Sequence, residues 1–199
     1  MEDKASSLNQ RIAERVRELR AAHALSLDAL ADRSGVSRSM ISVIERGESS
    51  ATAVVLDKLA AGLDVPLASL FDPPAAAAHA EPVSRRKDQS EWQDPASGYV
   101  RRNVSPPGAP QPMQIVEVHF PPGERVVFEA PVREMRAFQQ IWVLEGHIDV
   151  TVGEERHRLR EGDCLAMRLD GSTIFQNRTR KPARYAVVIA SEANWRQLR

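Results

Sequence analysis

The sequence predicts a multi-domain protein of α then β class, in which a bundle of short helices precedes an antiparallel β domain. Three observations predict this order. Apolar residues recur at helical spacing up to about residue 71, alanines and prolines dominate the stretch after it, and short β-branched runs separated by turn residues follow. We therefore predict a first domain at residues 1–72, a flexible linker at 73–94 and a second domain at 95–199.

The composition of the chain excludes several classes of protein. Its 199 residues carry 27 Lys+Arg and 27 Asp+Glu, so the net charge of zero gives no general attraction to nucleic acid. The only cysteine, Cys164, excludes an intramolecular disulfide framework, and its apolar neighbours predict a buried side chain. We expect a cytoplasmic protein without a membrane segment, because the sequence shows no secretory signal and no apolar run of roughly 20 residues.

Five helices are expected in the first domain. They span about residues 8–23, 26–35, 38–47, 52–61 and 66–71. Ser7 with Gln10 has the pattern of a capping box for the first helix, and Ser26 and Ser37 are expected N-caps of the second and third. Gly35 is suited to the left-handed turn between those two helices.

The second and third helices carry the pattern of two helices that cross a tight turn. Small and apolar residues fill the expected crossing at Leu30, Ala31, Gly35, Val36, Ile41 and Ile44. Together with the Ile-Glu-Arg-Gly motif that ends at Gly47, these positions make the segment 12–71 resemble the lambda-repressor-like (XRE) family of helix-turn-helix regulators. The resemblance implies a five-helix DNA-binding domain whose third helix enters the major groove.

The resemblance also implies which residues contact DNA. Base edges would face Ser37, Arg38, Ser39 and Ser42, and the phosphate backbone would lie near Ser26 and Arg46. Arg38 is expected to contribute most, because a guanidinium can bind guanine O6 and N7 with two hydrogen bonds. Purely structural roles stay open for two of these residues, N-capping for Ser37 and a helix C-terminal cation for Arg46.

The charge of the first domain predicts weak DNA binding by a single copy. Residues 1–72 hold nine Lys+Arg and eleven Asp+Glu, whereas DNA-binding domains usually have a basic excess. A homodimer on a palindromic double-stranded operator would add the contacts of two domains. The basic triplet at residues 85–87 either adds phosphate contacts or belongs to a solvated linker, and the second reading is favoured.

The second domain has the pattern of an antiparallel jelly-roll barrel. Strands are expected at about residues 115–120, 124–128, 139–144, 147–152, 163–167, 173–176 and 184–189. The motifs at residues 141–146 and 161–165, followed by Asn177, resemble the cupin family of small β-barrels. The resemblance covers roughly residues 113–190.

Metal-binding cupins place histidines and a carboxylate at four positions of these motifs. In this sequence the four positions hold Val132, Glu134, Gln139 and Thr173. Neutral amide and hydroxyl groups with a single carboxylate are poor ligands for a divalent ion, so we expect no metal and no other cofactor. The sequence shows neither a metal site nor the motif of an activated nucleophile, so we do not expect an enzyme.

The mouth of the predicted barrel is the candidate effector pocket. Polar groups on an apolar wall are expected from Glu134, Gln139, Trp142, Arg168, Thr173 and Gln176. A filled barrel that only dimerises is the alternative. The sequence thus predicts a sequence-specific DNA-binding transcriptional regulator whose cupin domain dimerises and senses a small molecule. Two other functions stay open, a metal-independent cupin with a protein-binding helical domain and a cupin enzyme acting on a small metabolite.

Overall fold

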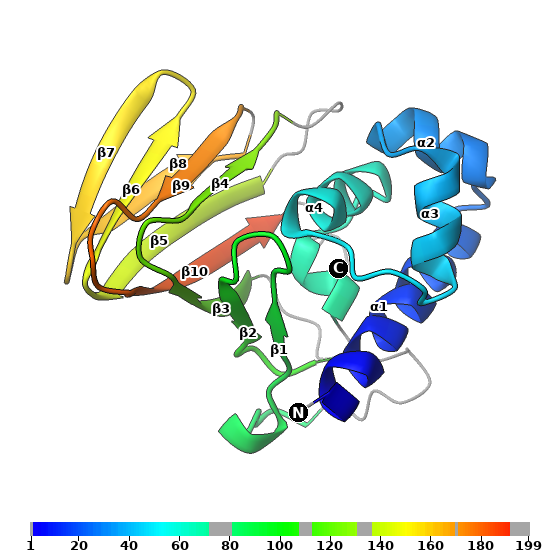
Figure 1. Ribbon diagram of the computed structural model, residues 1–199, viewed down its shortest axis with the longest axis horizontal. Helices are drawn as coiled ribbons and strands as arrows, with labels where there is room; N and C mark the ends of the chain where they lie inside the picture. The colour runs from blue at the N-terminus through cyan, green and yellow to red at the C-terminus, as the bar shows by residue number, and fades with distance from the viewer. Residues whose placement is uncertain (1, 72–80, 108–112, 131–136, 170, 192–199) are drawn as a thin grey trace.

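The computed structural model describes the chain in five ranges. They are residues 2–71, 81–107, 113–130, 137–169 and 171–191. The helices gather on one side of the molecule and the strands on the other, and one helix, α4, lies between the remaining helices and the sheets (Figure 1). The predicted order of α then β is therefore confirmed. None of the described helices has the length and apolar character needed to cross a membrane.

The helical part contains four α-helices and one 3-10 helix. They are α1 (Glu2–Ala22), α2 (Leu27–Ser34), α3 (Arg38–Glu45), α4 (Ala53–Gly62) and η1 (Leu67–Phe71). The predicted five helices are corrected to four α-helices, because the short segment after Pro66 forms the tighter 3-10 turn that suits brief runs. Since α1 begins at Glu2, Ser7 lies inside this helix and does not cap it.

Local capping fixes the junction of α2 and α3. The hydroxyl of Ser26 accepts a hydrogen bond from the Ala29 N–H at 3.0 Å, and that of Ser37 accepts one from the Met40 N–H at 3.3 Å. Gly35 takes the left-handed conformation with φ of 68°, which lets the chain turn sharply between the two helices. The predicted caps and turn are confirmed.

The β part consists of two antiparallel sheets. The larger has the order β1-β2-β3-β10-β5-β8 and the smaller the order β4-β9-β6-β7. The strand bounds are β1 (Glu91–Gln93), β2 (Val100–Asn103), β3 (Met113–Phe120), β4 (Arg125–Phe128), β5 (Ala137–Glu145), β6 (His147–Val152), β7 (Glu155–Arg160), β8 (Cys164–Arg168), β9 (Thr173–Gln176) and β10 (Ala183–Ser191). No hydrogen-bonded strand pair joins the sheets among the described residues, so the expected closed barrel is corrected to two facing sheets.

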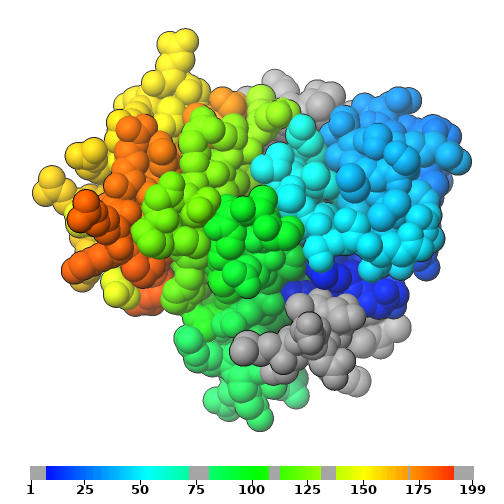
Figure 2. Space-filling view, in the orientation of Figure 1, coloured from blue at the N-terminus to red at the C-terminus, as the bar shows by residue number. Residues whose placement is uncertain are grey.

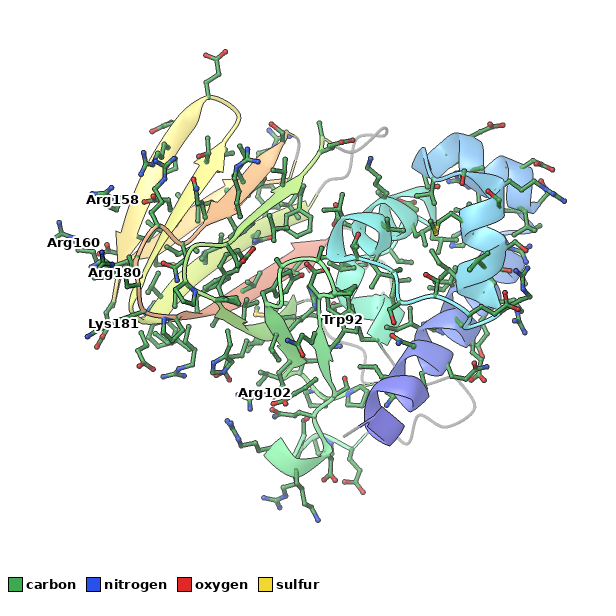
Figure 3. The ribbon with its side chains drawn as sticks, viewed as in Figure 1. Trp92, Arg102, Arg158, Arg160, Arg180 and Lys181 are labelled. Carbon is green, nitrogen blue, oxygen red and sulfur yellow. The ribbon has the colours of Figure 1, made fainter. Side chains whose placement is uncertain are left out.

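Aromatic side chains connect the two sheets and the helical part. The ring of Phe175 on the smaller sheet stacks on Tyr185 of the larger sheet, with centroids 5.9 Å apart. A series of neighbouring rings continues through Phe120, Tyr99 and Trp92, and each ring lies 5.8–6.4 Å from the next. The series ends at Phe71 of η1, whose ring centroid lies 5.6 Å from that of Trp92. Figure 3 shows Trp92 between the sheets and the helices.

The two parts are also joined by polar contacts. Asp94 is buried, and its carboxylate accepts the N–H of Ala53 at 2.9 Å, where α4 begins. The guanidinium of Arg101 lies over the ring of Phe71, 5.2 Å from its centroid, and Lys58 on α4 pairs with Glu129 at 2.8 Å. In the space-filling view the helical part meets the β part without an open gap (Figure 2). The helical domain is therefore docked on the sheets.

Candidate DNA-reading surface and interdomain cavity

The N-terminal turn of α3 forms an exposed surface on the side of the molecule away from the sheets (Figure 1). Ser37, Arg38 and Ser39 are exposed, and Met40 is 42% exposed. The opposite side of the same helix places Ile41 in the core with no exposed area. This alternation follows from the helical period, and it leaves the predicted base-facing residues open to a partner.

An ion pair places the first turn of α2 beside the first turn of α3. Nε of Arg38 lies 3.1 Å from a carboxylate oxygen of Asp28, and each side chain is more than 60% exposed. Exposed pairs of this kind are worth at most about 1 kcal/mol, so a guanine or a phosphate can compete for the guanidinium. Asp28 was not among the residues predicted from the sequence, and its only signal there is an acidic residue in a first helical turn.

The other predicted DNA contacts already have partners within the protein. Arg46 donates to the hydroxyl of Ser42 at 2.6 Å and to both carboxylate oxygens of Glu48 at 2.7 Å. The hydroxyls of Ser26 and Ser37 accept from backbone N–H groups as N-caps. The hydroxyl of Ser39 shares a hydrogen bond with that of Ser37 at 3.2 Å, so Arg38 and Ser39 are the two predicted base-facing side chains that neither cap a helix nor bind Arg46.

A denser group of cations lies at the far end of the β part. Figure 3 shows Arg158, Arg160, Arg180 and Lys181 together there, on the opposite side of the molecule from α3. The carboxylate of Asp149, which is buried beneath this group, pairs with Arg158 at 3.3 Å. This separation makes the far-end arginines suitable controls for any experiment on the charge of α3.

A cavity of about 110 Å³ lies between the helical part and the interior of the sheets. Its apolar wall contains aromatic residues of both sheets, including Phe120, Phe128, Phe175 and Tyr185. The helical part contributes Asp57, Ala60 and Ala61 from α4 and Leu67 from η1. Because α4 covers the sheets at this point, both domains form the wall of one cavity.

The charged residues that line the cavity are two acids, Asp57 and Glu129, and one base, Arg101. Burial raises the pKa of Asp57 from 3.8 to about 6, and the positive charge of Arg101 opposes this increase. Asp57 is therefore mostly ionised at neutral pH, and the guanidinium of Arg101 is always charged. Tyr99, Gln139 and Thr173 also line the cavity, and burial raises the pKa of the Tyr99 phenol, which stays neutral.

The structure separates the predicted effector-pocket residues into three groups. Gln139 and Thr173 line the cavity. Trp142 and Arg168 are exposed on the outer face of the larger sheet, and Gln176 accepts a hydrogen bond at 2.9 Å from exposed Arg178. Since side chains alternate along a strand, an offset of three residues from Gln139 to Trp142, or from Thr173 to Gln176, puts the second residue on the opposite face. Glu134, like Val132, lies outside the described residues.

The sequence prediction missed most of the cavity residues, among them the charged Asp57 and Arg101. Asp57 and Arg101 belong to different domains, and neither forms part of a recognisable motif. The only signal for Asp57 is an acidic residue within the apolar helix Ala53–Gly62, and the signal for Arg101 is a basic residue that follows Tyr99 and Val100 in a short strand. A site that forms at a domain junction cannot be assembled from the pattern of either domain alone.

The residues at the cupin metal positions do not fit a metal ion. Gln139 and Thr173 supply an amide and a hydroxyl, and no group of three His, Cys, Asp or Glu side chains suited to a metal occurs among the described residues. We expect the purified protein to contain less than about a tenth of an equivalent of iron, zinc or manganese. Elemental analysis checks this, and one metal per chain whose removal changes DNA binding would contradict it.

The outer face of the larger sheet is unusually apolar for an exposed surface. Phe138 and Trp142 on β5 are 58% and 51% exposed, and Met113 and Ile115 on β3 are exposed on the same face. The strand β10 lies between them and contributes Ala186, Val188 and Ala190. Cys164 of β8 is opposite Trp142 and exposed, which corrects the expectation that this cysteine is buried. Its offset of three residues from the buried Met167 explains the difference.

Comparison with known proteins matches both parts of the chain. Residues 16–70 match the HTH_3 family model, which describes a helix-turn-helix. The HTH-type transcriptional regulator SutR of Escherichia coli (strain K12) is 26% identical over 162 residues, covering 81% of this chain and 84% of that protein. The crystal structure of an HTH_3 family transcriptional regulator from Vibrio cholerae has a TM-score of 0.76 and 26% identity, covering 94% of this chain and 98% of the other. The cupin_2 domain of an XRE family regulator from Enterobacter cloacae is a weaker match, with a TM-score of 0.42 and 14% identity over 46% of this chain and 95% of the other.

The capped, tightly turned α2 and α3 form a helix-turn-helix, and a pair of facing antiparallel sheets follows it in the chain. The family match covers the helix-turn-helix, and the two relatives with 26% identity extend over most of the chain. The chain is therefore similar to HTH-type transcriptional regulators, and its residues 16–70 are similar to the HTH_3 helix-turn-helix family.

Proposed function

We propose that the protein is a sequence-specific transcriptional regulator that reads double-stranded DNA with α3. The observation that carries this proposal is the exposed first turn of α3, which presents Arg38 and Ser39 on the side of the molecule away from the sheets. A recognition helix of this motif contacts base edges with its N-terminal residues. Ser26, Ser37, Ser42 and Arg46 would then hold the helix against the backbone or extend the contact, once Arg46 exchanges Glu48 for a phosphate.

A homodimer joined through the β domain is the second part of the proposal. Two copies can supply the affinity that the acidic balance of a single helical domain lacks. The apolar outer face around Phe138 and Trp142 favours a second copy as its partner, because exposed side chains of this size are otherwise costly in water. Two-fold symmetry of the dimer would match a palindromic operator.

An effector in the interdomain cavity is the third part. A concave apolar wall with a few polar groups is the usual form of a small-molecule site, and Gln139 and Thr173 supply two of those groups here. The role is regulatory and not enzymatic, because the cavity-lining residues offer neither a fitting metal set nor an activated nucleophile. A protein that regulates transcription works where the DNA is, so the expected cytoplasmic location remains part of the proposal.

Replacing Arg38 with alanine is expected to remove about 1 to 3 kcal/mol of discrimination between the operator and unrelated DNA, because the guanidinium binds a base. The fold should be unchanged, since the side chain is largely exposed and its ion pair with Asp28 is exposed as well. The measurement is a titration of operator and unrelated duplexes, with circular dichroism to check the fold.

Arg160→Ala is the matched control, because it removes the same charge at the opposite end of the molecule. This variant should retain the preference of the wild-type protein. If Arg38→Ala keeps full operator preference, or if both variants lose it equally, Arg38 does not read a base.

A further inference from the structure

We propose that the interdomain cavity binds a small neutral molecule, of the size and kind of a short carboxamide, with an apolar body and one end that both donates and accepts hydrogen bonds. The inference rests on the proposed role of the cavity as the effector site. It adds the chemistry of the ligand, which follows from a group of neutral polar side chains in the cavity wall.

Four neutral polar side chains line the cavity without a hydrogen-bond partner in the protein. They are Tyr99, Gln139, Thr173 and Tyr185, and each is at most 8% exposed. No hydrogen bond among the described residues involves their phenol, amide or hydroxyl groups. A water-sized molecule still reaches these groups, since none of them is among the fully occluded unpaired atoms of the described residues. Buried polar groups are almost always paired, so this group points to a partner from outside the chain.

The polar groups come from both sheets and favour a ligand end that donates and accepts. Gln139 and Tyr185 belong to β5 and β10 of the larger sheet, and Thr173 belongs to β9 of the smaller one. The amide of Gln139 presents a carbonyl acceptor beside an amino donor, and the hydroxyls can donate or accept. A ligand that only accepts would leave part of this set unpaired, which is costly in a buried site. A planar amide can pair with both groups of Gln139.

The charged residues of the wall do not require a charged ligand. The carboxylate of Glu129 pairs with Lys58 at 2.8 Å, and Asp57 and Arg101 attract each other. The guanidinium of Arg101 also lies over the ring of Phe71. A ligand with a net charge would leave water for largely apolar surroundings in which the opposite charges are already engaged. A neutral ligand avoids this cost.

The rest of the wall sets the size of the ligand and its apolar body. Phe120, Phe128 and Phe175 with Val118 and Val187 provide an apolar surface. Water against these side chains finds few partners, whereas an apolar body gains free energy by leaving water. The volume of about 110 Å³ is below the roughly 150 Å³ of a cavity that accepts benzene. The ligand is therefore smaller than benzene, a limit that acetamide and propionamide meet.

Thermal unfolding of the full-length protein with small amides and their analogues tests the ligand class. Propionate and propylammonium carry a charge at the size of propionamide, butanone accepts hydrogen bonds but does not donate them, and benzamide has the same polar end on a larger body. A ligand this small is expected to bind with a Kd of about 1 mM. Acetamide or propionamide at about 20 times its Kd should raise Tm by roughly 5 °C. An equal shift with any of the four analogues, or no shift with either amide, would overturn the proposal.

Three variants locate the site. Gln139→Leu should lose the shift with the amides, and without ligand it should unfold at the same temperature as the wild type or above, because an apolar side chain replaces an unpaired buried amide. Thr173→Val makes an equivalent change on the other sheet and should weaken the response. Gln93→Leu is the matched control, since Gln93 is exposed on β1 outside the cavity, and it should keep the full shift. A Gln139→Leu protein that keeps the shift, or that unfolds below the wild type, would show that this amide does not await a ligand.

The same proteins separate this inference from the proposed function. Because Ala60 and Ala61 of α4 also line the cavity, a bound ligand contacts both domains and favours their docked arrangement. The operator affinity of the wild-type protein should then change by at least about five-fold with the stabilising amide, and that of Gln139→Leu should not change.

The outcomes of these two measurements fall on different claims. Operator binding by a protein whose Tm responds to neither amide would overturn the inference and leave the DNA-reading role standing. A Tm shift that Gln139→Leu abolishes, in a protein whose operator affinity stays constant, would support the ligand chemistry and overturn the effector role. A Tm shift without binding to any DNA would overturn the DNA-reading role.

Discussion

Replacing Trp142 with arginine is expected to convert the proposed dimer to a monomer and to weaken operator binding by about 100-fold or more, because the effective concentration supplied by the second copy is lost. Trp142 is half exposed at the centre of the apolar outer face, between Ala186 and Cys164 on the neighbouring strands. A charged side chain at this point cannot be buried against a second copy without a partner.

Sedimentation and operator titration of the same sample measure this effect. Val83→Arg is the matched control, because Val83 is equally exposed and apolar but lies outside the larger sheet. This control should remain dimeric. A Trp142→Arg protein that still sediments as the wild-type dimer would show that the outer face is not the dimer surface.

Replacing Trp92 with alanine is expected to lower the free energy of unfolding by about 3 to 5 kcal/mol, as for other large buried aromatic residues. Trp92 is buried between Phe71 of the helical part and Tyr99 of the β part, so its loss leaves a cavity at the junction. Unfolding in urea should then change from one transition to two, because the domains no longer support each other.

Trp142→Ala is the control for this second prediction, because it makes the same chemical change at an exposed position. Measured at low protein concentration, it should cost well under 1 kcal/mol. Equal losses for the two tryptophans, or a single unchanged transition for Trp92→Ala, would show that the ring series does not hold the domains together.

The parts of the fold that depend on local interactions could be predicted from the sequence. The caps Ser26 and Ser37 and the turn at Gly35 are set by hydrogen bonds and conformational preferences within a few residues. The strand β7 could not, because its sequence Glu-Arg-His-Arg-Leu-Arg has charged residues on an edge strand and lacks an apolar pattern. The strand β1 lies in the predicted linker, and it pairs with β2.

In the candidate sites, too, the local features could be predicted from the sequence and the long-range ones could not. Arg38 could be placed at the exposed start of a helix because helical periodicity is local. Of the residues expected in the candidate effector pocket, Gln139 and Thr173 line the interdomain cavity, whereas Trp142, Arg168 and Gln176 do not. Strand register determines which residues share a face, and a motif count does not fix it.

The docking of α4 on the sheets bears on how strongly an effector could be coupled to the helical domain. A fully flexible linker over 73–94 would weaken any coupling between an effector and the DNA-reading helix. Residues 91–93 instead form a strand of the larger sheet, and Asp94 binds the start of α4. The first strand of the β domain thus lies before residue 95. The helical domain contacts the cavity directly, because residues of α4 form part of its wall.

Selection of bound fragments from a genomic DNA pool by the full-length protein, followed by footprinting of the enriched sequences, tests the central claim most directly. A dimer that reads DNA with two α3 helices predicts one enriched palindrome, with two protected half-sites separated by a whole number of helical turns. Arg38→Ala should fail to enrich the same palindrome. Recovery of fragments without a shared sequence, or of a shared sequence that Arg38→Ala enriches equally well, would contradict the account.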